Sequence, residues 1–297
     1  MNDWNHQFLQ ANGIRIHYVR QGAGAPLVLL HGWPEFWLTW RKNIGPLSEN
    51  FDVIVPDLRG FGETDKPDLP AWQGYALEML VEDLRGLLDG LGIDRCGIVS
   101  HDVGAFVAQA FARTYPDRAT GLFFFNCPYP GIGSRWLEPD HLKEIWYQSF
   151  HQLPVATAVV GQSRQTCETY FRHFLSHWPH QPDTFDADIE AWVDNFMRPG
   201  NLQGGFNWYI AINDARLDTM RHGPPALPKI EVPACVRWGV SDKVLKVEWA
   251  DGLQDYFADV DFQRVAEAGH FVQYERPDYA NREIASFFAG LAGHSGQ

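Results

Sequence analysis

The stretch Val99-Ser100-His101-Asp102-Val103-Gly104-Ala105 joins an apolar run at residues 96–99 to a longer apolar segment at residues 103–112. A short apolar run indicates a buried strand, and a segment that is apolar nearly all round indicates a buried helix. A serine and a glycine stand two positions before and two positions after Asp102. Small residues at this spacing let a strand and a helix approach closely while the middle side chain is held out. We therefore predict a nucleophile elbow that presents Asp102.

An aspartate at this point of the turn favours a particular chemistry. Its carboxyl group, with a reference pKa of ~3.9, is already ionised near neutral pH, and the helix dipole stabilises that charge. Attack on an acyl carbon would give a reactive anhydride, whereas attack on a saturated carbon gives an ordinary ester that water can hydrolyse. The turn thus indicates substitution at an epoxide ring or at a carbon–halogen bond. The alternative is that Asp102 only caps the helix that follows.

Composition limits the class of protein. The 297 residues are 45% hydrophobic, which is enough for one large core with an insertion. The net charge is −13, and no dense stripe of Lys and Arg occurs along the chain. A nucleic acid or an anionic membrane surface is therefore not expected as a partner.

Targeting signals and cysteine usage indicate the compartment. The first residues, Met1 to His6, lack the basic start and apolar segment of a signal peptide, and no apolar run is long enough to span a bilayer. The cysteines lie far apart, without the paired spacing of a disulfide frame or a zinc site. We expect buried thiols in a reducing, cytoplasmic compartment. The cysteines are Cys96, Cys127, Cys167 and Cys235.

Along the chain, apolar runs typical of buried strands alternate with amphipathic segments typical of helices, which predicts a mostly parallel sheet with helices on both faces. The strands are expected at 14–19, 26–30, 53–55, 96–99, 122–125, 234–239 and 260–265, and the clearest helices at 77–91, 103–112 and 277–291. The alternation stops at residue 128, and the chain to residue 225 shows a helical, Trp-, His- and Phe-rich pattern. We predict a core domain of residues 1–127 and 226–297, and an inserted helical lid of residues 128–225.

Three further loops follow predicted strands. Asp242 comes after Trp238-Gly239, His270 stands in Gly269-His270-Phe271, and His31-Gly32-Trp33-Pro34 offers the backbone N–H of Trp33. In an α/β sheet, working residues lie on loops after the carboxyl ends of the strands. The chain order, nucleophile, acid and histidine, is the order of the α/β-hydrolases.

The sequence resembles the α/β-hydrolase superfamily, and within it the epoxide hydrolases, over essentially the whole chain. The resemblance is strong in the core and weak in the lid. It rests on His31-Gly32-Trp33-Pro34-Glu35, Asp57-Leu58-Arg59-Gly60-Phe61-Gly62, His101-Asp102-Val103-Gly104, Asp242 and Gly269-His270-Phe271.

The resemblance implies a role for each residue. Asp102 attacks the substrate, Asp242 orients His270, and His270 activates the water that cleaves the ester. The backbone N–H groups of Trp33 and Val103 form the oxyanion hole.

The resemblance also implies two lid tyrosines that hydrogen-bond the departing epoxide oxygen. Asn207-Trp208-Tyr209 is similar to the family's Trp-Tyr pair, and Trp146-Tyr147-Gln148 to the site of the second donor. Tyr209 and Tyr147 are therefore the expected donors, with Tyr129 and Tyr170 in reserve.

The expected substrate is a small apolar epoxide, which reacts with water and needs no metal or organic cofactor. The pocket is expected to be apolar and aromatic, lined partly by Trp33, Phe36 and lid residues near Phe206. The chain also allows a homodimer.

Two other readings remain open. A dehalogenase uses the same Asp-His-Asp chemistry, but Val103 and Trp33 stand where a halide-binding Trp and its assisting Asn are usual, and Tyr147-Gln148 stands where a fluoroacetate dehalogenase has a His-Trp pair. A non-catalytic ligand-binding protein on the same fold is the other. Asn126 occupies an alternative acid position but carries an amide, and His101 is interpreted as a packing and hydrogen-bonding residue.

Overall fold

The computed structural model describes residues 4–294 and contains an eight-stranded sheet in the order β1-β2-β4-β3-β5-β6-β7-β8. β2 runs antiparallel to β1 and β4, and the remaining neighbours are parallel. The strands are β1 (His6–Ala11), β2 (Ile14–Gln21), β3 (Ala25–Leu30), β4 (Phe51–Pro56), β5 (Cys96–His101), β6 (Ala119–Phe125), β7 (Ala234–Gly239) and β8 (Val260–Val265). All seven expected strands are present. β1 was not predicted, because it is an edge strand whose side chains are at best half-buried.

The helices of the core segments are α1 (Arg41–Ser48), α2 (Ala71–Gly74), α3 (Leu77–Gly90), α4 (Val103–Thr114), α11 (Val272–Glu275) and α12 (Pro277–His294). Short 3-10 helices are η1 (Trp37–Trp40), η2 (Pro116–Arg118) and η4 (Val247–Asp255). The predicted helices at 77–91, 103–112 and 277–291 therefore form, with ends that differ by a few residues.

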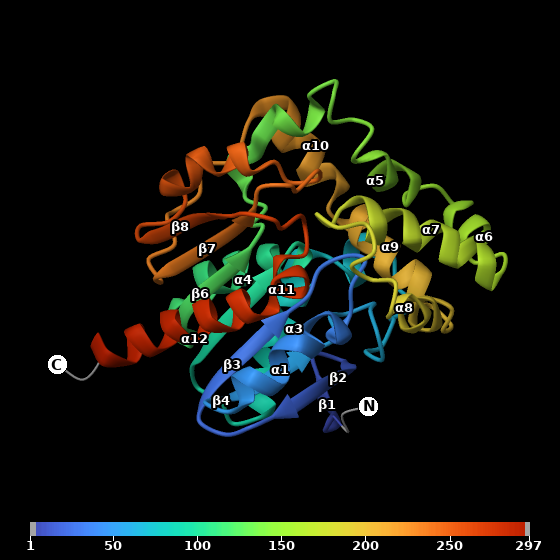
Figure 1. Ribbon diagram of the computed structural model, residues 1–297. Helices are drawn as coiled ribbons and strands as arrows, with labels where there is room; N and C mark the ends of the chain where they lie inside the picture. The colour runs from blue at the N-terminus through green and yellow to red at the C-terminus, as the bar shows by residue number, and fades with distance from the viewer. Residues whose placement is uncertain (1–3, 295–297) are drawn as a thin grey trace.

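Helices cover both faces of the sheet. Leu27 and Leu30 are an odd number of residues apart on β3, so their side chains point to opposite faces. Leu27 lies beside Gly97 of β5, where an added Cβ would come within 2.4 Å of Phe288 on α12. Leu30 lies near Leu84 of α3. α12 and α3 therefore pack against opposite faces, and Figure 1 shows α12 crossing one of them.

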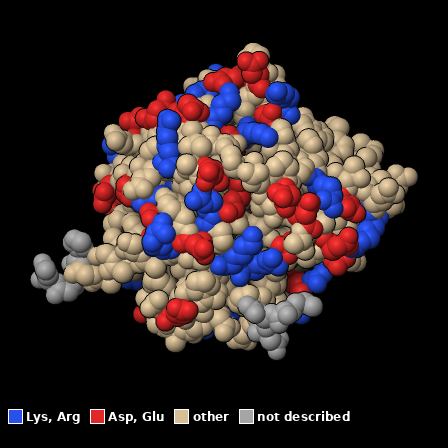
Figure 2. All heavy atoms as spheres, in the orientation of Figure 1, with Lys and Arg blue, Asp and Glu red and all other residues tan. Residues whose placement is uncertain are grey.

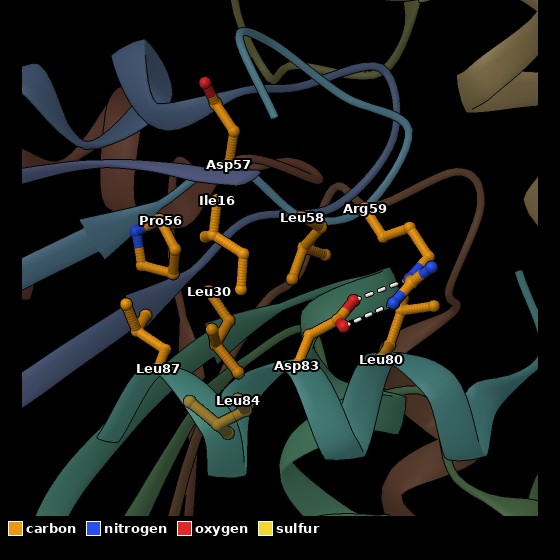
Figure 3. Close-up of a pocket in the computed structure, with 10 residues that line it drawn as sticks. All are labelled: Ile16, Leu30, Pro56, Asp57, Leu58, Arg59, Leu80, Asp83, Leu84 and Leu87. Carbon is orange, nitrogen blue, oxygen red and sulfur yellow. Dashed lines mark hydrogen bonds and ion pairs between the residues drawn. The ribbon is translucent and has the colours of Figure 1, made fainter. Parts of the chain in front are cut away.

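A small internal cavity lies between the sheet and α3, beside the buried ion pair of Arg59 and Asp83 (Figure 3). Its volume is about 20 Å³, which is room for roughly one water molecule. This cavity is too small to hold an organic substrate.

Between β6 and β7 the described chain forms helices and no strand. They are η3 (Pro130–Leu137), α5 (Trp146–Phe150), α6 (Ala156–Val160), α7 (Arg164–His177), α8 (Ile189–Phe196), α9 (Asn201–Ala211) and α10 (Asn213–His222). Figure 1 shows these helices gathered on one side of the sheet. Large aromatic side chains such as Phe171, Phe174 and Trp178 are buried among them.

The distribution of surface charges and the burial of the cysteines agree with the expectations from the sequence. Figure 2 shows basic side chains interspersed with acidic ones over the face that it draws. The four cysteines are buried and unpaired. None of the helices described is both long and apolar enough to cross a membrane. The first three residues of the N-terminal stretch discussed above lie outside the described residues.

Candidate active site

Asp102 lies at a sharp turn between β5 and α4. Its backbone has φ +48° and ψ −115°, in a region that residues other than glycine rarely adopt. A glycine is needed two positions later, at Gly104, since an added Cβ would come within 2.6 Å of the Leu30 carbonyl oxygen. The Asp102 side chain makes no capping hydrogen bond to α4. Asp102 therefore does not cap α4 through its side chain, and its backbone has the sharp, strained turn expected of an elbow.

The loop after β3 holds one oxygen of this carboxylate. The backbone N–H of Trp33 donates to Asp102 Oδ1 at 2.9 Å. Gly32 makes this approach feasible, because an added Cβ would lie 2.3 Å from the Asp102 Cβ. Val103 is the first residue of α4, so its N–H has no acceptor within the helix. Of the two N–H groups expected for an oxyanion hole, that of Trp33 thus contacts the Asp102 carboxylate, and that of Val103 belongs to the residue next to Asp102 in the chain.

Loops after β7 and β8 bring the other two residues to Asp102. His270 Nδ1 lies 2.9 Å from Asp242 Oδ2, and His270 Nε2 lies 3.9 Å from Asp102 Oδ2. The side chains of His270 and Asp242 are fully buried, whereas that of Asp102 is 15% exposed. The Asp102 carboxylate is therefore partly accessible, while His270 and Asp242 are shielded from solvent.

The charges around His270 shift its titration. Burial alone lowers the pKa of the ring, but the Asp242 carboxylate and its hydrogen bond, with the Asp102 carboxylate, outweigh burial and raise the pKa to about 9. Burial alone raises the pKa of Asp242, and the His270 ring with the Leu245 N–H bring it below the ordinary value. The pair is thus an ionised carboxylate and a strongly basic imidazole.

Asn126 connects the two loops that carry Asp242 and His270. Its Nδ2 donates to Asp242 Oδ2 and, at 3.0 Å, to the carbonyl oxygen of Gly269, while its Oδ1 accepts from Gly239 N–H at 3.1 Å. The sequence excluded Asn126 as the acid but did not predict this contact. The only sequence signal was its position directly after β6.

The two tyrosines predicted from the lid lie side by side against Trp33, in the loop after β3. Tyr147 on α5 stacks on the Trp33 ring, with centroids 4.9 Å apart, and Tyr209 on α9 meets the same ring edge-on at 5.8 Å. Their own ring centroids are 5.5 Å apart. Burial and the nearby Asp102 charge raise the pKa of both phenols, so both hydroxyls keep their protons at neutral pH.

Comparison with known proteins identifies the family. Residues 25–277 match the family model described as the alpha/beta hydrolase fold. The chain is 34% identical to the "Soluble epoxide hydrolase" of Corynebacterium sp. (strain C12), over 96% of this chain and 98% of that protein. It belongs to the epoxide hydrolase family of α/β-hydrolases. It is therefore a hydrolase by family.

Other members of the epoxide hydrolase family are similar over nearly the whole chain. "Epoxide hydrolase 4" of Homo sapiens is 30% identical, over 94% of this chain and 77% of that protein. The solved structure "Epoxide hydrolase CorEH without ligand" has a TM-score of 0.84 and 32% identity, and covers 96% of this chain and 99% of that one. A Bacillus megaterium epoxide hydrolase in complex with an inhibitor has a TM-score of 0.84 and 26% identity, over 95% and 100% of the two chains.

The other two aromatic residues predicted to line the pocket differ in their surroundings. Phe206 stacks on His151, with centroids 4.0 Å apart, and His151 contacts Tyr209. Phe36 packs against Trp37 and Trp192, so its place in the pocket stays a prediction.

The two reserve tyrosines are already engaged in hydrogen bonds. The hydroxyl of Tyr129 donates to the carbonyl oxygen of Trp249 at 2.6 Å and accepts from the N–H of Gly252 at 3.0 Å. The hydroxyl of Tyr170 lies 2.6 Å from Nε2 of His151. Neither is as free to meet a substrate as Tyr147 and Tyr209.

Glu35 and His101 form a buried pair next to the turn at Asp102, which the sequence analysis did not predict. Glu35 Oε2 lies 2.7 Å from His101 Nδ1 and accepts from Gly32 N–H at 2.7 Å, and His101 Nε2 lies 2.7 Å from the His270 carbonyl oxygen. Burial alone raises the pKa of Glu35, but the charge and hydrogen bond of His101, with the Thr39 hydroxyl, bring it to about 2. Glu35 and His101 thus connect the loop that carries Trp33 with the loop that carries His270.

Replacing Glu35 with glutamine is expected to destabilise the protein by ~3–5 kcal/mol, because the change breaks a buried pair by removing one charge. Glu35 has a lower pKa in the folded protein than its ordinary 4.5, so its contribution is present above pH 4.5 and lost as the pH falls toward 2. The variant should lack this component of acid unfolding. Urea unfolding between pH 7 and pH 3 measures both effects.

The matched control for Glu35 is Glu63→Gln. Glu63 pairs with Arg198 at the surface, where both side chains are more than a third exposed. Its loss should cost less than about 1 kcal/mol. Equal free energies of unfolding for the Glu35 and Glu63 variants would show that the buried pair stabilises the fold no more than a surface pair does.

Proposed function

We propose that this protein converts an apolar epoxide into a vicinal diol through a covalent ester on Asp102. The observation that carries the proposal is the position of the Asp102 carboxylate. It lies between the N–H of Trp33 and the ring of His270 and is partly exposed, and its charge acts on the phenols of both lid tyrosines. This arrangement offers a nucleophile, a base and two proton donors to one small region.

In the first step, Asp102 Oδ2 attacks a carbon of the ring. Oδ1 is already engaged by the N–H of Trp33, which leaves Oδ2 as the oxygen free to form the new bond. The carbon–oxygen bond of the epoxide breaks, and its electron pair moves to the ring oxygen, to which Tyr147 and Tyr209 donate hydrogen bonds. The product of this step is an ester whose carbonyl oxygen is Oδ1.

In the second step, His270 takes a proton from water, and the hydroxide attacks the ester carbon of Asp102. The charge that develops on Oδ1 meets the N–H groups of Trp33 and Val103. The alkoxide leaves with the proton from His270, and Asp242 stabilises the imidazolium formed in between. Hydrolysis leaves Asp102 as a carboxylic acid, and the proton that it releases on ionising balances the proton that the former ring oxygen takes up by way of the lid tyrosines. Diol and free carboxylate result, without metal or organic cofactor.

The aromatic surroundings support an apolar substrate. Trp33, Phe206 and the two tyrosine rings form one buried cluster with His151. We also propose that the protein acts in a reducing compartment such as the cytoplasm, since its four cysteines are free. A homodimer remains part of the proposal.

Loss of the tyrosine hydroxyls tests the leaving group. A donor that strengthens as the alkoxide develops is worth ~2–4 kcal/mol, and ~1.4 kcal/mol corresponds to one decade in rate. Tyr147→Phe and Tyr209→Phe are each expected to slow alkylation of Asp102 by roughly tens- to a thousandfold. The double variant should lose nearly all ring opening and still bind the substrate. Pre-steady-state alkylation by an aryl epoxide measures this.

The control is Tyr18→Phe. The hydroxyl of Tyr18 donates to Gln7 between strands β2 and β1, at the edge of the sheet. This variant should react like the parent. A haloalkane series should be run in parallel. Alkylation within about twofold of the parent in the lid variants, together with turnover of haloalkanes, would favour the dehalogenase reading instead.

A further inference from the structure

A cation without a carboxylate partner lies in the lid beside the two tyrosines. Arg216 on α10 is half-buried, and burial lowers the pKa of its guanidinium, whereas the phenols of Tyr147 and Tyr209 act in the opposite direction. Among the described residues no Asp or Glu forms an ion pair with it, and its Nε atom has no hydrogen-bond partner. A desolvated cation without a counter-ion costs stability, so a functional reason for Arg216 is expected.

Arg216 contacts the tyrosines through one side-chain amide. Its Nη1 donates to Oε1 of Gln148, the residue that follows Tyr147 on α5. An arginine can only donate, so the oxygen of the Gln148 amide must face it and the NH₂ group must face the other way. That NH₂ group, Nε2, donates to the Tyr147 hydroxyl oxygen at 3.3 Å. The chemistry of Arg216 thus fixes the direction of the amide.

The amide leaves the Tyr147 proton without competition from this side. Because Gln148 Nε2 donates to the Tyr147 oxygen, the amide cannot accept the Tyr147 proton, which stays available for another acceptor. The Tyr209 ring lies beside that of Tyr147, with centroids 5.5 Å apart, and no such amide contact is found at its hydroxyl among the described residues. Both phenols lie near enough to Asp102 for its charge to raise their pKa.

We propose that Arg216, acting through the Gln148 amide, is a positioning residue that polarises the Tyr147 hydroxyl and makes Tyr147 the principal proton donor to the epoxide oxygen. Hydrogen bonds in such a chain strengthen one another in a low-dielectric site. The cation at its end favours negative charge on the Tyr147 oxygen. This inference rests on the proposed function and adds that Tyr147, and not Tyr209, is the principal proton donor.

The protons balance over one turnover. As the Asp102–carbon bond forms and the epoxide carbon–oxygen bond breaks, the electron pair on the ring oxygen takes the Tyr147 proton. The phenolate that remains is stabilised by Gln148 Nε2–H and by the charge of Arg216. Hydrolysis regenerates Asp102 as a carboxylic acid, and the proton that this acid releases on ionising restores Tyr147.

Single-turnover kinetics of Arg216→Met tests the relay. We expect roughly tenfold slower alkylation of Asp102 by an aryl epoxide, an unchanged rate of ester hydrolysis, and unchanged substrate binding. Arg216→Lys retains a cation and should recover part of the rate. Gln148→Leu, which cuts the same chain in its middle, should resemble Arg216→Met.

The matched control is Gln152→Met. Gln152 Nε2 links α5 to α10 by donating to the Gln148 carbonyl oxygen and to Asn213 Oδ1, without touching Tyr147. If Arg216 only packs α10 against α5, the Gln152 and Arg216 variants should lose activity alike and in both steps. That result would overturn the proposal.

A spectroscopic readout separates this inference from the proposed function. In protein labelled with ¹³C at the tyrosine Cζ, the Tyr147 resonance, assigned by its loss in Tyr147→Phe, should shift in Arg216→Met and stay in place in Gln152→Met. This shift is measured without substrate and stands even if no epoxide reacts. Suppose that the parent enzyme is alkylated normally, while Arg216→Met shows an unshifted Tyr147 resonance and an unchanged alkylation rate. This result would overturn the relay and leave the proposed function in place.

Discussion

In the His270→Gln variant, the protein is expected to gain the mass of one substrate molecule and to stop there. Alkylation needs only the ionised Asp102 carboxylate, whereas cleavage of the ester needs a base. The amide of glutamine fills part of the imidazole volume but cannot take a proton from water. Ester hydrolysis should fall by at least about 10³-fold. Intact-protein mass spectrometry after mixing with excess epoxide measures the modified fraction.

The control for this variant is His222→Gln, a change at a histidine whose side chain is 71% exposed and pairs with Asp218. It should turn over normally. Asp242→Asn is expected to slow hydrolysis as well, because the ring loses the partner that orients it and stabilises its charge. A His270→Gln protein that turns over normally, or that a good substrate of the parent never modifies, would show that His270 is not the base.

The charges at the site explain how a histidine with a raised pKa can serve as a base. The pKa of about 9 belongs to the free protein, in which His270 faces the carboxylates of Asp242 and Asp102. Alkylation converts Asp102 into a neutral ester and removes one of these charges. The pKa of His270 should therefore fall when the ester forms, and more of the ring is then neutral at pH 7. Histidine NMR of the free and the alkylated protein compares the two values.

The strands and the elbow could be predicted because their signals are local. A parallel strand that is buried on both faces is a continuous apolar run, and small residues around Asp102 are a requirement of its turn. The edge strand β1 was missed because its side chains alternate between exposed and half-buried positions and form no continuous apolar run. Asp242 and His270 could be predicted from their positions after two expected strands, together with the resemblance.

Contacts between distant parts of the chain left no such signal. Asn126 and Asp242 are 116 positions apart, Glu35 and His101 are 66 apart, and Arg216 meets Gln148 across 68. No periodicity links these pairs, since only the packing of separate loops and lid helices brings them together. For the same reason the sequence named lid tyrosines by resemblance but could not order Tyr147 and Tyr209. The boundaries of the lid and the role of Phe36 stay predictions.

Removing the Asp102 carboxylate is expected to have the largest effect of all. Asp102→Ala leaves no group that can bond to the substrate carbon, so alkylation should be undetectable and turnover should fall by at least about 10⁴-fold. Residue 102 has a positive φ, which alanine adopts only with strain, so circular dichroism must show that the variant folds. Asp251→Ala, at a side chain that is 67% exposed, is the control and should keep full activity.

Labelled water then distinguishes a nucleophile from a general base. With enzyme in excess over epoxide in H₂¹⁸O, the first diol formed should contain no label, because its two oxygens come from the epoxide and from Oδ2 of Asp102. The label should instead enter the Asp102 carboxylate, where digestion and mass spectrometry locate it. It should reach the diol only in later turnovers. If the first diol already carries ¹⁸O and Asp102 does not, water attacks the ring directly, and Asp102 acts only as a base.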